Sequence, residues 1–226
     1  MDIVSIVISL FVLLFAITIH EAAHAWSAHK LGDPTAWSLG RASLNPVVHI
    51  DPFGTVLFPI ILAVIGAPVF GWAKPVPVNP YNLRNPRRDN LWISFSGPAA
   101  NLTAAAAGLI LILLLKALNP GLTEFLRDFL FFRQGFPRGI FPLHGVMLIL
   151  FYGVLINTYL AIFNLIPVPP LDGSGILSGL LSDKAAETYD RIRPYGFFIV
   201  LALVYLGVLG FIVRPIQIVI FTLIFS

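Results

Sequence analysis

The chain has 226 residues, of which 58% are hydrophobic and only 11% charged, with a formal net charge of +3 and a mean hydropathy of +0.89. A soluble domain is about a quarter charged, so this composition excludes a water-soluble globule and predicts a polytopic membrane protein. The mild basic excess suits loops beside anionic lipid rather than nucleic acid. The lack of cysteine excludes disulfides and Cys-ligated metals.

The first element is an apolar run without charge, residues 3–19, and helix-forming sequence continues to about Lys30. Met1-Asp2 lacks the basic start of a signal peptide, so we expect a retained transmembrane helix with ionisable residues at its C-terminal end. Gly32-Asp33-Pro34 is predicted to end this helix.

The region that follows, around 37–75, is a candidate for re-entrant or short-strand structure. Residues 37–52 carry Asn-Pro and Asp-Pro turn pairs and are expected to form a loop or short strands. Residues 54–72 are apolar but contain prolines and glycines. This pattern leaves open either a membrane span or a hairpin that enters and leaves by one face.

Three later apolar segments are predicted to cross the membrane, at 91–118, 143–166 and 194–213. Gly97-Pro98 interrupts the first near its start, and Arg214-Pro215 separates the third from a final apolar piece whose crossing is left open. The predicted fold class is therefore all-α, with about five (four to six) transmembrane helices in a single membrane-embedded domain, 1–226.

The basic residues predict the orientation of the chain. With the first helix running from outside to inside and no net crossing at 54–72, nine of the 14 Lys and Arg lie in cytoplasmic segments. The positive-inside rule favours this orientation. The nine are Lys30, Arg41, Lys74, Arg84, Arg87, Arg88, Lys184, Arg191 and Arg193, and the five outside are Lys116, Arg127, Arg133, Arg138 and Arg214.

The sequence His20-Glu21-Ala22-Ala23-His24 stands at the end of the first predicted span. Two His four residues apart project from one helix face, close enough to bind one Zn²⁺ through imidazole nitrogens. Glu21 between them is placed to deprotonate a metal-bound water. Because ionisable groups are costly in a membrane helix, a metal site is favoured over side chains that merely reach toward the interface.

A catalytic zinc needs a third protein ligand if its fourth position is to hold water. His29 faces about 180° away from His20 on the helix, and Lys30 stands where a metzincin would have its third His. Glu124, the next Glu, lies across the membrane in the predicted topology. These exclusions leave an Asp, and Asp172 is favoured because it follows a span that ends on the same side as the first.

These motifs resemble the site-2 protease family of intramembrane zinc metalloproteases. HEAAH lies on one membrane helix, N-x-x-P-x-P-x-L-D-G (Asn164–Gly173) follows a later one, and Gly97-Pro98-x-x-Asn101 lies between them. The resemblance covers about residues 10–180, which would form the catalytic core, with membrane segments 194–226 after it. The 119–142 loop is too short for a PDZ domain, so we expect a minimal member without PDZ or CBS domains.

The resemblance implies one Zn²⁺ per chain, bound by His20, His24 and Asp172, with Glu21 as the catalytic base. Asn164 would bind the substrate backbone or stabilise the oxyanion. It also implies a three-helix core in the cell membrane, with an active site reached from the cytoplasmic side. The expected partners are the lipid bilayer and a membrane-protein substrate with a transmembrane segment, with no nucleic acid. The sequence specifies no oligomeric state.

Four other residues are accessory candidates. Gly97 and Pro98 are expected to kink their span or to allow close helix approach, and Asn101 to hydrogen-bond inside the bundle. Asn157 shares a helix face with Asn164, which fits either a site-lining role or helix–helix hydrogen bonding.

Three polar residues are interpreted as turn or interfacial residues: His49, Asp51 and His144. The alternative for the first two is a segment, 37–52, that pairs with an unwound substrate.

Three rival functions use the same residues. A di-iron bundle needs a second Glu-x-x-His pair and two further Glu, but neither Glu124 nor Glu187 has a His three residues later. A transporter predicts paired broken helices in two related halves, which this sequence lacks. A catalytically silent membrane binding protein is disfavoured because every presumed catalytic residue is present.

Overall fold

The computed structural model describes residues 3–58, 61, 72–132 and 142–226. These residues form helices and loops, with no strand among them. Within the described ranges, four helices are long and apolar enough to cross a membrane: α1 (Ile3–Lys30), α4 (Pro86–Leu118), α6 (Pro142–Asn164) and α10 (Val208–Phe225). The predicted all-α polytopic fold is confirmed, and four spans is the lower limit of the predicted range.

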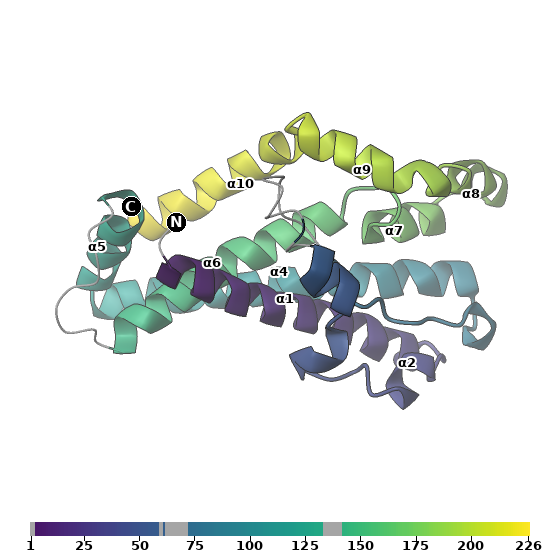
Figure 1. The fold of residues 1–226 in the computed structure, drawn as a ribbon, viewed down its shortest axis with the longest axis horizontal. Helices are drawn as coiled ribbons and strands as arrows, with labels where there is room; N and C mark the ends of the chain where they lie inside the picture. Colours follow the sequence, from purple (N-terminus) through teal and green to yellow (C-terminus); the bar gives the residue numbers. More distant parts are fainter. Residues whose placement is uncertain (1–2, 59–60, 62–71, 133–141) are drawn as a thin grey trace.

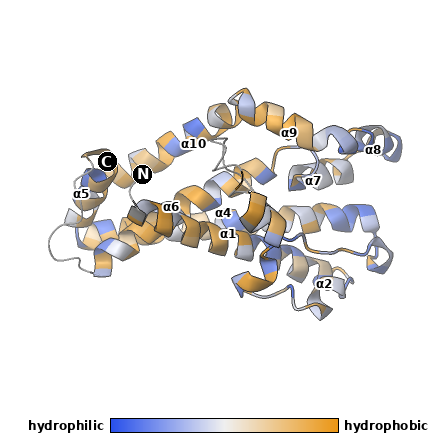
Figure 2. Cartoon of the chain, viewed as in Figure 1, coloured by the Kyte–Doolittle hydropathy of each residue, from blue (hydrophilic) through white to orange (hydrophobic). Residues whose placement is uncertain are grey.

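The central unit is a bundle of three spans in which α4 packs against both α1 and α6. Figure 1 shows the three side by side along the long axis of the molecule, with both termini at the end where α5 (Gly121–Arg127) lies. At that end the bundle buries Ile112, Met147 and Phe151. Large apolar side chains also cover the outer faces, including Val7, Leu10 and Leu111, and Figure 2 shows these spans as predominantly hydrophobic. Outward apolar faces are what a lipid solvent requires.

The short helices α7 (Asp172–Leu180) and α8 (Asp183–Asp190) lie at the other end of the bundle (Figure 1). α7 packs on α4, and α8 follows it. The remaining described elements are α2 (Thr35–Ser38), η1 (Pro46–His49), η2 (Pro52–Leu57), η3 (Pro80–Asn82), η4 (Asp128–Phe132), η5 (Arg193–Tyr195) and α9 (Gly196–Tyr205).

The 37–75 region corrects one expectation. Where short strands were an alternative, the described part of this region has the short helices α2, η1 and η2. The ends of the 54–72 segment meet, because the Trp72 N–H donates to Gly54 O at 3.1 Å and Thr55 Oγ1 donates to Trp72 O at 2.9 Å. A hairpin that enters and leaves the membrane by one face requires its two ends to lie together, so this contact fits the re-entrant alternative for the segment. Most of the residues between them, 59–60 and 62–71, lie outside the described residues.

One predicted interruption and one predicted helix boundary were wrong. α4 runs unbroken through Gly97-Pro98, since a membrane helix tolerates a proline whose freed carbonyl is satisfied elsewhere. The predicted 194–213 span is instead divided at Gly207, whose φ of +72° is a left-handed conformation that ends a helix. Arg214-Pro215 lies inside α10 rather than between two elements.

Candidate metal centre

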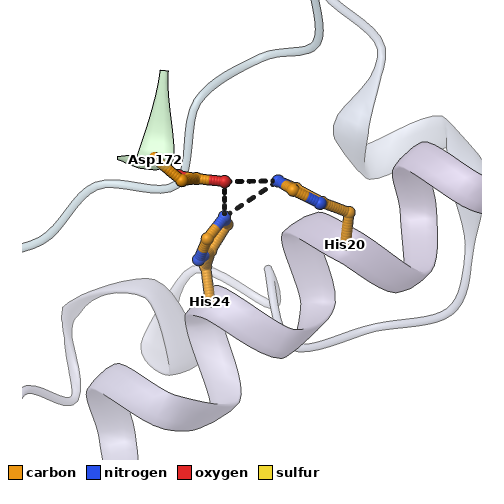
Figure 3. A group of neighbouring side chains, drawn as sticks. All are labelled: His20, His24 and Asp172. Atoms are coloured by element: carbon orange, nitrogen blue, oxygen red, sulfur yellow. Dashed lines mark hydrogen bonds and ion pairs between the residues drawn. The ribbon is translucent and has the colours of Figure 1, made fainter. Parts of the chain in front are cut away.

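α1 carries His20 and His24 on one face, one helical turn apart, as the four-residue spacing predicts. Both residues are buried: His20 is 5% exposed and His24 is 7% exposed. Their Nε2 atoms point toward one another at 3.0 Å (Figure 3).

Asp172, the first residue of α7, completes the group (Figure 3). Its Oδ2 lies 2.9 Å from His20 Nε2 and 3.3 Å from His24 Nε2. The proline-rich segment before it turns the chain back from the end of α6 toward α1. Gly173 permits this turn, because a Cβ there would collide with the carbonyl oxygens of Leu165 and Ile166. Asp172 thereby lies beside the C-terminal half of α1, although the two are far apart in the sequence.

Two glycines let α7 lie close to α4 and so fix the position of Asp172. A Cβ on Gly175 would collide with the Ser94 side chain, and one on Gly179 would lie 2.6 Å from Leu91 Cβ. A hydrogen bond from Arg87 Nε to Ser178 O, at 2.9 Å, adds a polar contact between these helices.

Both imidazoles use their Nδ1 atoms for hydrogen bonds to oxygen. His20 Nδ1 lies 2.6 Å from Asn101 Oδ1, and His24 Nδ1 lies 2.7 Å from the Ile93 carbonyl. Because these oxygens can only accept, each Nδ1 carries a proton, and in the neutral form of either ring Nε2 keeps a lone pair. Two lone pairs and a carboxylate oxygen therefore converge, and such a group is stabilised by a cation.

The three converging atoms fit Zn²⁺. All lie within 4.8 Å of one another, and atoms held at ~2 Å from a tetrahedral metal are about 3.3 Å apart. Burial raises the pKa of the Asp172 carboxyl, but hydrogen bonds and charge interactions with His20 and His24 outweigh it and lower the pKa to about 2. Asp172 is thus ionised at neutral pH, as a metal ligand must be.

A cavity of about 480 Å³ opens beside this group. Glu21, which is half-buried, and Asn164 line it together with the three converging residues. One N–H of the Asn164 amide donates to Leu160 O in its own helix at 2.9 Å. The cavity therefore places a carboxylate and an amide beside the candidate metal-binding group.

The sequence profile of peptidase family M50 matches residues 8–207. The chain belongs to peptidase family M50. This is the site-2 protease family, so the family predicted from the HEAAH and Asp-Gly motifs is confirmed, and with it the zinc cofactor and the metalloprotease class.

Three relatives of this M50 chain have names that contain the words "zinc metalloprotease". The chain is 35% identical over 191 residues to "Putative zinc metalloprotease YwhC" of Bacillus subtilis (strain 168). The aligned region covers 84% of this chain and 77% of the relative. Two proteins named "Putative zinc metalloprotease Rip2", from Mycolicibacterium smegmatis and Mycobacterium tuberculosis, are each 29% identical over 84% and 87% of this chain. The chain spans 63% of the length of each mycobacterial relative. No solved structure matches it.

The accessory residues of the M50 chain lie directly behind the histidines. Asn101 bonds to His20 as described, and Asn157 Oδ1 accepts from Asn101 Nδ2 at 2.7 Å. Gly97 faces both imidazoles, since a Cβ there would lie 2.5 Å from His24 Nε2. Pro98 is buried beside it, and nothing in the structure gives it a further role.

His49, Asp51 and His144 lie outside the group. His49 is buried, with Nε2 2.9 Å from Ser43 O, and Asp51 accepts from two backbone N–H groups at the start of η2. The His144 ring lies 4.4 Å from that of Phe125. The turn interpretation fits the contacts of His49 and Asp51.

One wall of the cavity was missed by sequence reasoning. It is an extended segment, 72–79, which contributes Trp72, Ala73, Pro75, Val76 and Val78. Alternating prolines in Lys74-Pro75-Val76-Pro77 restrict the backbone to extended conformations, so the sequence predicts an extended course for this segment. The sequence does not predict that the segment lies beside the cavity.

Proposed function

We propose that this M50 protein hydrolyses peptide bonds in or near transmembrane segments of membrane-protein substrates, in regulated intramembrane proteolysis. The observation that carries the proposal is the convergence of His20, His24 and Asp172 beside Glu21, at the end of an apolar span. Helices α1, α4 and α6, which are all long enough to cross the bilayer, supply most of the cavity. A substrate reaching this cavity would arrive from the membrane or its surface.

In this proposal His20, His24 and Asp172 hold the metal and Glu21 handles protons. Zn²⁺ bound there would supply a Lewis acid that polarises the scissile carbonyl and lowers the pKa of water. Glu21 takes the proton of the attacking water and delivers it to the leaving amine. Asn164 has one N–H occupied by Leu160 O, and its second N–H donates to the developing oxyanion or to the substrate backbone.

The extended segment 72–79 supports a way of holding the substrate. The amides of a transmembrane helix are bonded internally, so cleavage requires local unwinding. An unwound segment can then lie along extended backbone, as in strand addition. The segment lines one wall of the cavity, and we assign it the pairing role in place of residues 37–52.

The proposal is tested with purified protein in vesicles of phosphatidylcholine and phosphatidylglycerol. The probe is a single-span peptide carrying a fluorophore and a quencher on either side of a helix-destabilising Asn-Gly segment. We expect cleavage of this peptide and much slower cleavage of a soluble peptide with the same Asn-Gly segment. Equal cleavage of the two would contradict an intramembrane substrate.

The role of Glu21 is tested by Glu21→Gln, which keeps the shape but removes the base. We expect cleavage to fall by about 10²–10⁴-fold, with zinc content measured by atomic absorption unchanged. Glu187→Gln is the matched control, because Glu187 is exposed on α8 away from the cavity, and it should cleave as the wild type does. Retained cleavage in a fully zinc-loaded Glu21→Gln variant would overturn the assignment.

A further inference from the structure

A chain of buried amide groups connects the interior of the bundle with His20. Asn157 Nδ2 donates to Gly153 O at 2.8 Å, and Asn101 Nδ2 donates to Asn157 Oδ1 at 2.7 Å and to Ala16 O at 3.0 Å. Asn101 Oδ1 lies 2.6 Å from His20 Nδ1. Asn101 is 0% exposed and Asn157 is 6% exposed, so water does not compete for these bonds.

The direction of each bond is forced from the far end of this chain. The Gly153 and Ala16 carbonyls can only accept, so the NH₂ groups of Asn157 and Asn101 must face them. Only Oδ1 of Asn101 then remains for His20. If His20 carried its proton on Nε2, the lone pair of Nδ1 would face the lone pairs of this oxygen. Two buried acceptors that face each other without a proton between them are strongly unfavourable.

We propose that Asn101 is a positioning residue that holds His20 as the Nδ1–H tautomer, with Nε2 open toward the metal, and that Asn157 fixes the orientation of Asn101. His24 has the same support from a backbone oxygen, the Ile93 carbonyl. The two histidines therefore differ, because the short hydrogen bond of His20 comes from a side chain that substitution can remove, whereas that of His24 comes from the backbone and the Ser96 hydroxyl lies farther away, at 3.4 Å from His24 Nδ1.

The inference rests on the proposed ligand set, and two Asn101 variants of the full chain in detergent micelles test it. Asn101→Asp keeps an oxygen acceptor for His20 Nδ1–H but loses the NH₂ group, whereas Asn101→Leu loses both. We expect zinc affinity, measured by competition with a chromophoric chelator, to fall about 10–100-fold in Asn101→Leu. In Asn101→Asp it should equal or exceed that of the wild type, although both variants lose thermal stability.

A second readout is the tautomer itself. In chelator-treated protein with ¹⁵N-labelled histidine at alkaline pH, wild-type His20 should show its proton on Nδ1, and Asn101→Leu should show a mixture or the Nε2–H form. If Asn101→Leu fails to fold, Asn157→Leu replaces it and should shift both readouts in the same direction by a smaller factor.

The controls separate this inference from the ligand assignment. Thr18→Val removes a buried hydroxyl on α1 that bonds to Leu14 O and not to His20, and it should leave zinc affinity unchanged. His20→Ala should abolish tight zinc binding, and if it does not, the ligand set itself fails. If His20→Ala loses zinc while Asn101→Leu keeps wild-type affinity and tautomer, or if Thr18→Val weakens zinc equally, the positioning role is overturned.

Discussion

Gly97 lies where α4 crosses α1, directly against the two imidazoles. A Cβ at this position would lie 2.5 Å from His24 Nε2, 2.6 Å from His24 Cε1 and 2.7 Å from His20 Cε1. The rings cannot yield easily, because each Nδ1 is held by a hydrogen bond to a buried oxygen. The absence of a side chain at Gly97 is therefore what allows α4 to contact the two histidines that we propose as ligands.

Gly97→Ala is expected to damage the site more than the fold. Overpacking costs about 1–3 kcal/mol of stability, and a displaced ring of even 1 Å can slow catalysis about 10²-fold. Zinc affinity and cleavage of the membrane peptide are the measurements. The matched control is Gly153→Ala on α6, where a Cβ meets nothing within 4 Å and should slightly stabilise the helix. Wild-type zinc affinity in Gly97→Ala would contradict this account of the close approach.

At the scale of elements, the extended segment 72–79 is held in place by two buried charged residues. Arg41 donates to the backbone oxygens of Val48 and Lys74, and to Pro75 O at 3.3 Å. Asp33, three residues after the end of α1, accepts from the Asn79 N–H at 2.7 Å and from Asn82 Nδ2 at 2.8 Å. These bonds join the wall of the cavity to the helix that carries the histidines.

The Asp33 carboxylate makes this connection sensitive to pH. Burial raises its pKa, but hydrogen bonds from Asn82, Thr35 and Asn79 outweigh it and lower the pKa below the ordinary value. A lowered folded-state pKa stabilises the fold above the unfolded pKa of ~3.9, and the stabilisation disappears as the pH falls through the folded-state pKa.

Asp33→Asn is therefore expected to lower the free energy of unfolding by about 2 kcal/mol at pH 7. The difference from the wild type should shrink below about pH 4. Thermal unfolding in micelles at pH 7, 5 and 3.5 measures this difference. Asp183→Asn is the control, because the Asp183 side chain is 94% exposed and its ion pair with Arg87 adds little stability. A difference between Asp33→Asn and wild type that does not vary with pH would exclude the carboxylate as its cause.

Local or strongly patterned properties of the chain could be predicted from its sequence. Apolar length predicted α1, α4 and α6, and the four-residue spacing of His20 and His24 predicted their shared face. A boundary that depends on one backbone conformation, as at Gly207, and the contacts between distant segments could not be predicted in this way. The position of segment 72–79 on the cavity wall depends on Arg41 and Asp33. Their partners within this segment lie more than thirty residues away along the chain, and no periodicity encodes such contacts.

At the scale of the whole molecule, the basic residues separate along the long axis. α1 ends, α4 begins and α6 ends toward the α7 and α8 end of the molecule, whereas α5 lies at the opposite end (Figure 1). Arg84, Arg87 and Lys184 belong to the first end, and Lys116 and Arg127 to the second. Because basic loops are retained in the cytoplasm, we propose from the larger basic content of the first end that the metal centre is reached from the cytoplasmic side.

The orientation can be measured directly because the chain has no cysteine. Lys184→Cys marks the α8 end and Leu118→Cys, at a residue that is 83% exposed, marks the α5 end. We expect a membrane-impermeant maleimide to label Lys184→Cys in inside-out vesicles and Leu118→Cys in right-side-out vesicles. Each variant should still cleave the membrane peptide, which shows that it is folded. The reverse labelling pattern would place His20, His24 and Asp172 toward the outside and would require the substrate to be reached from that face.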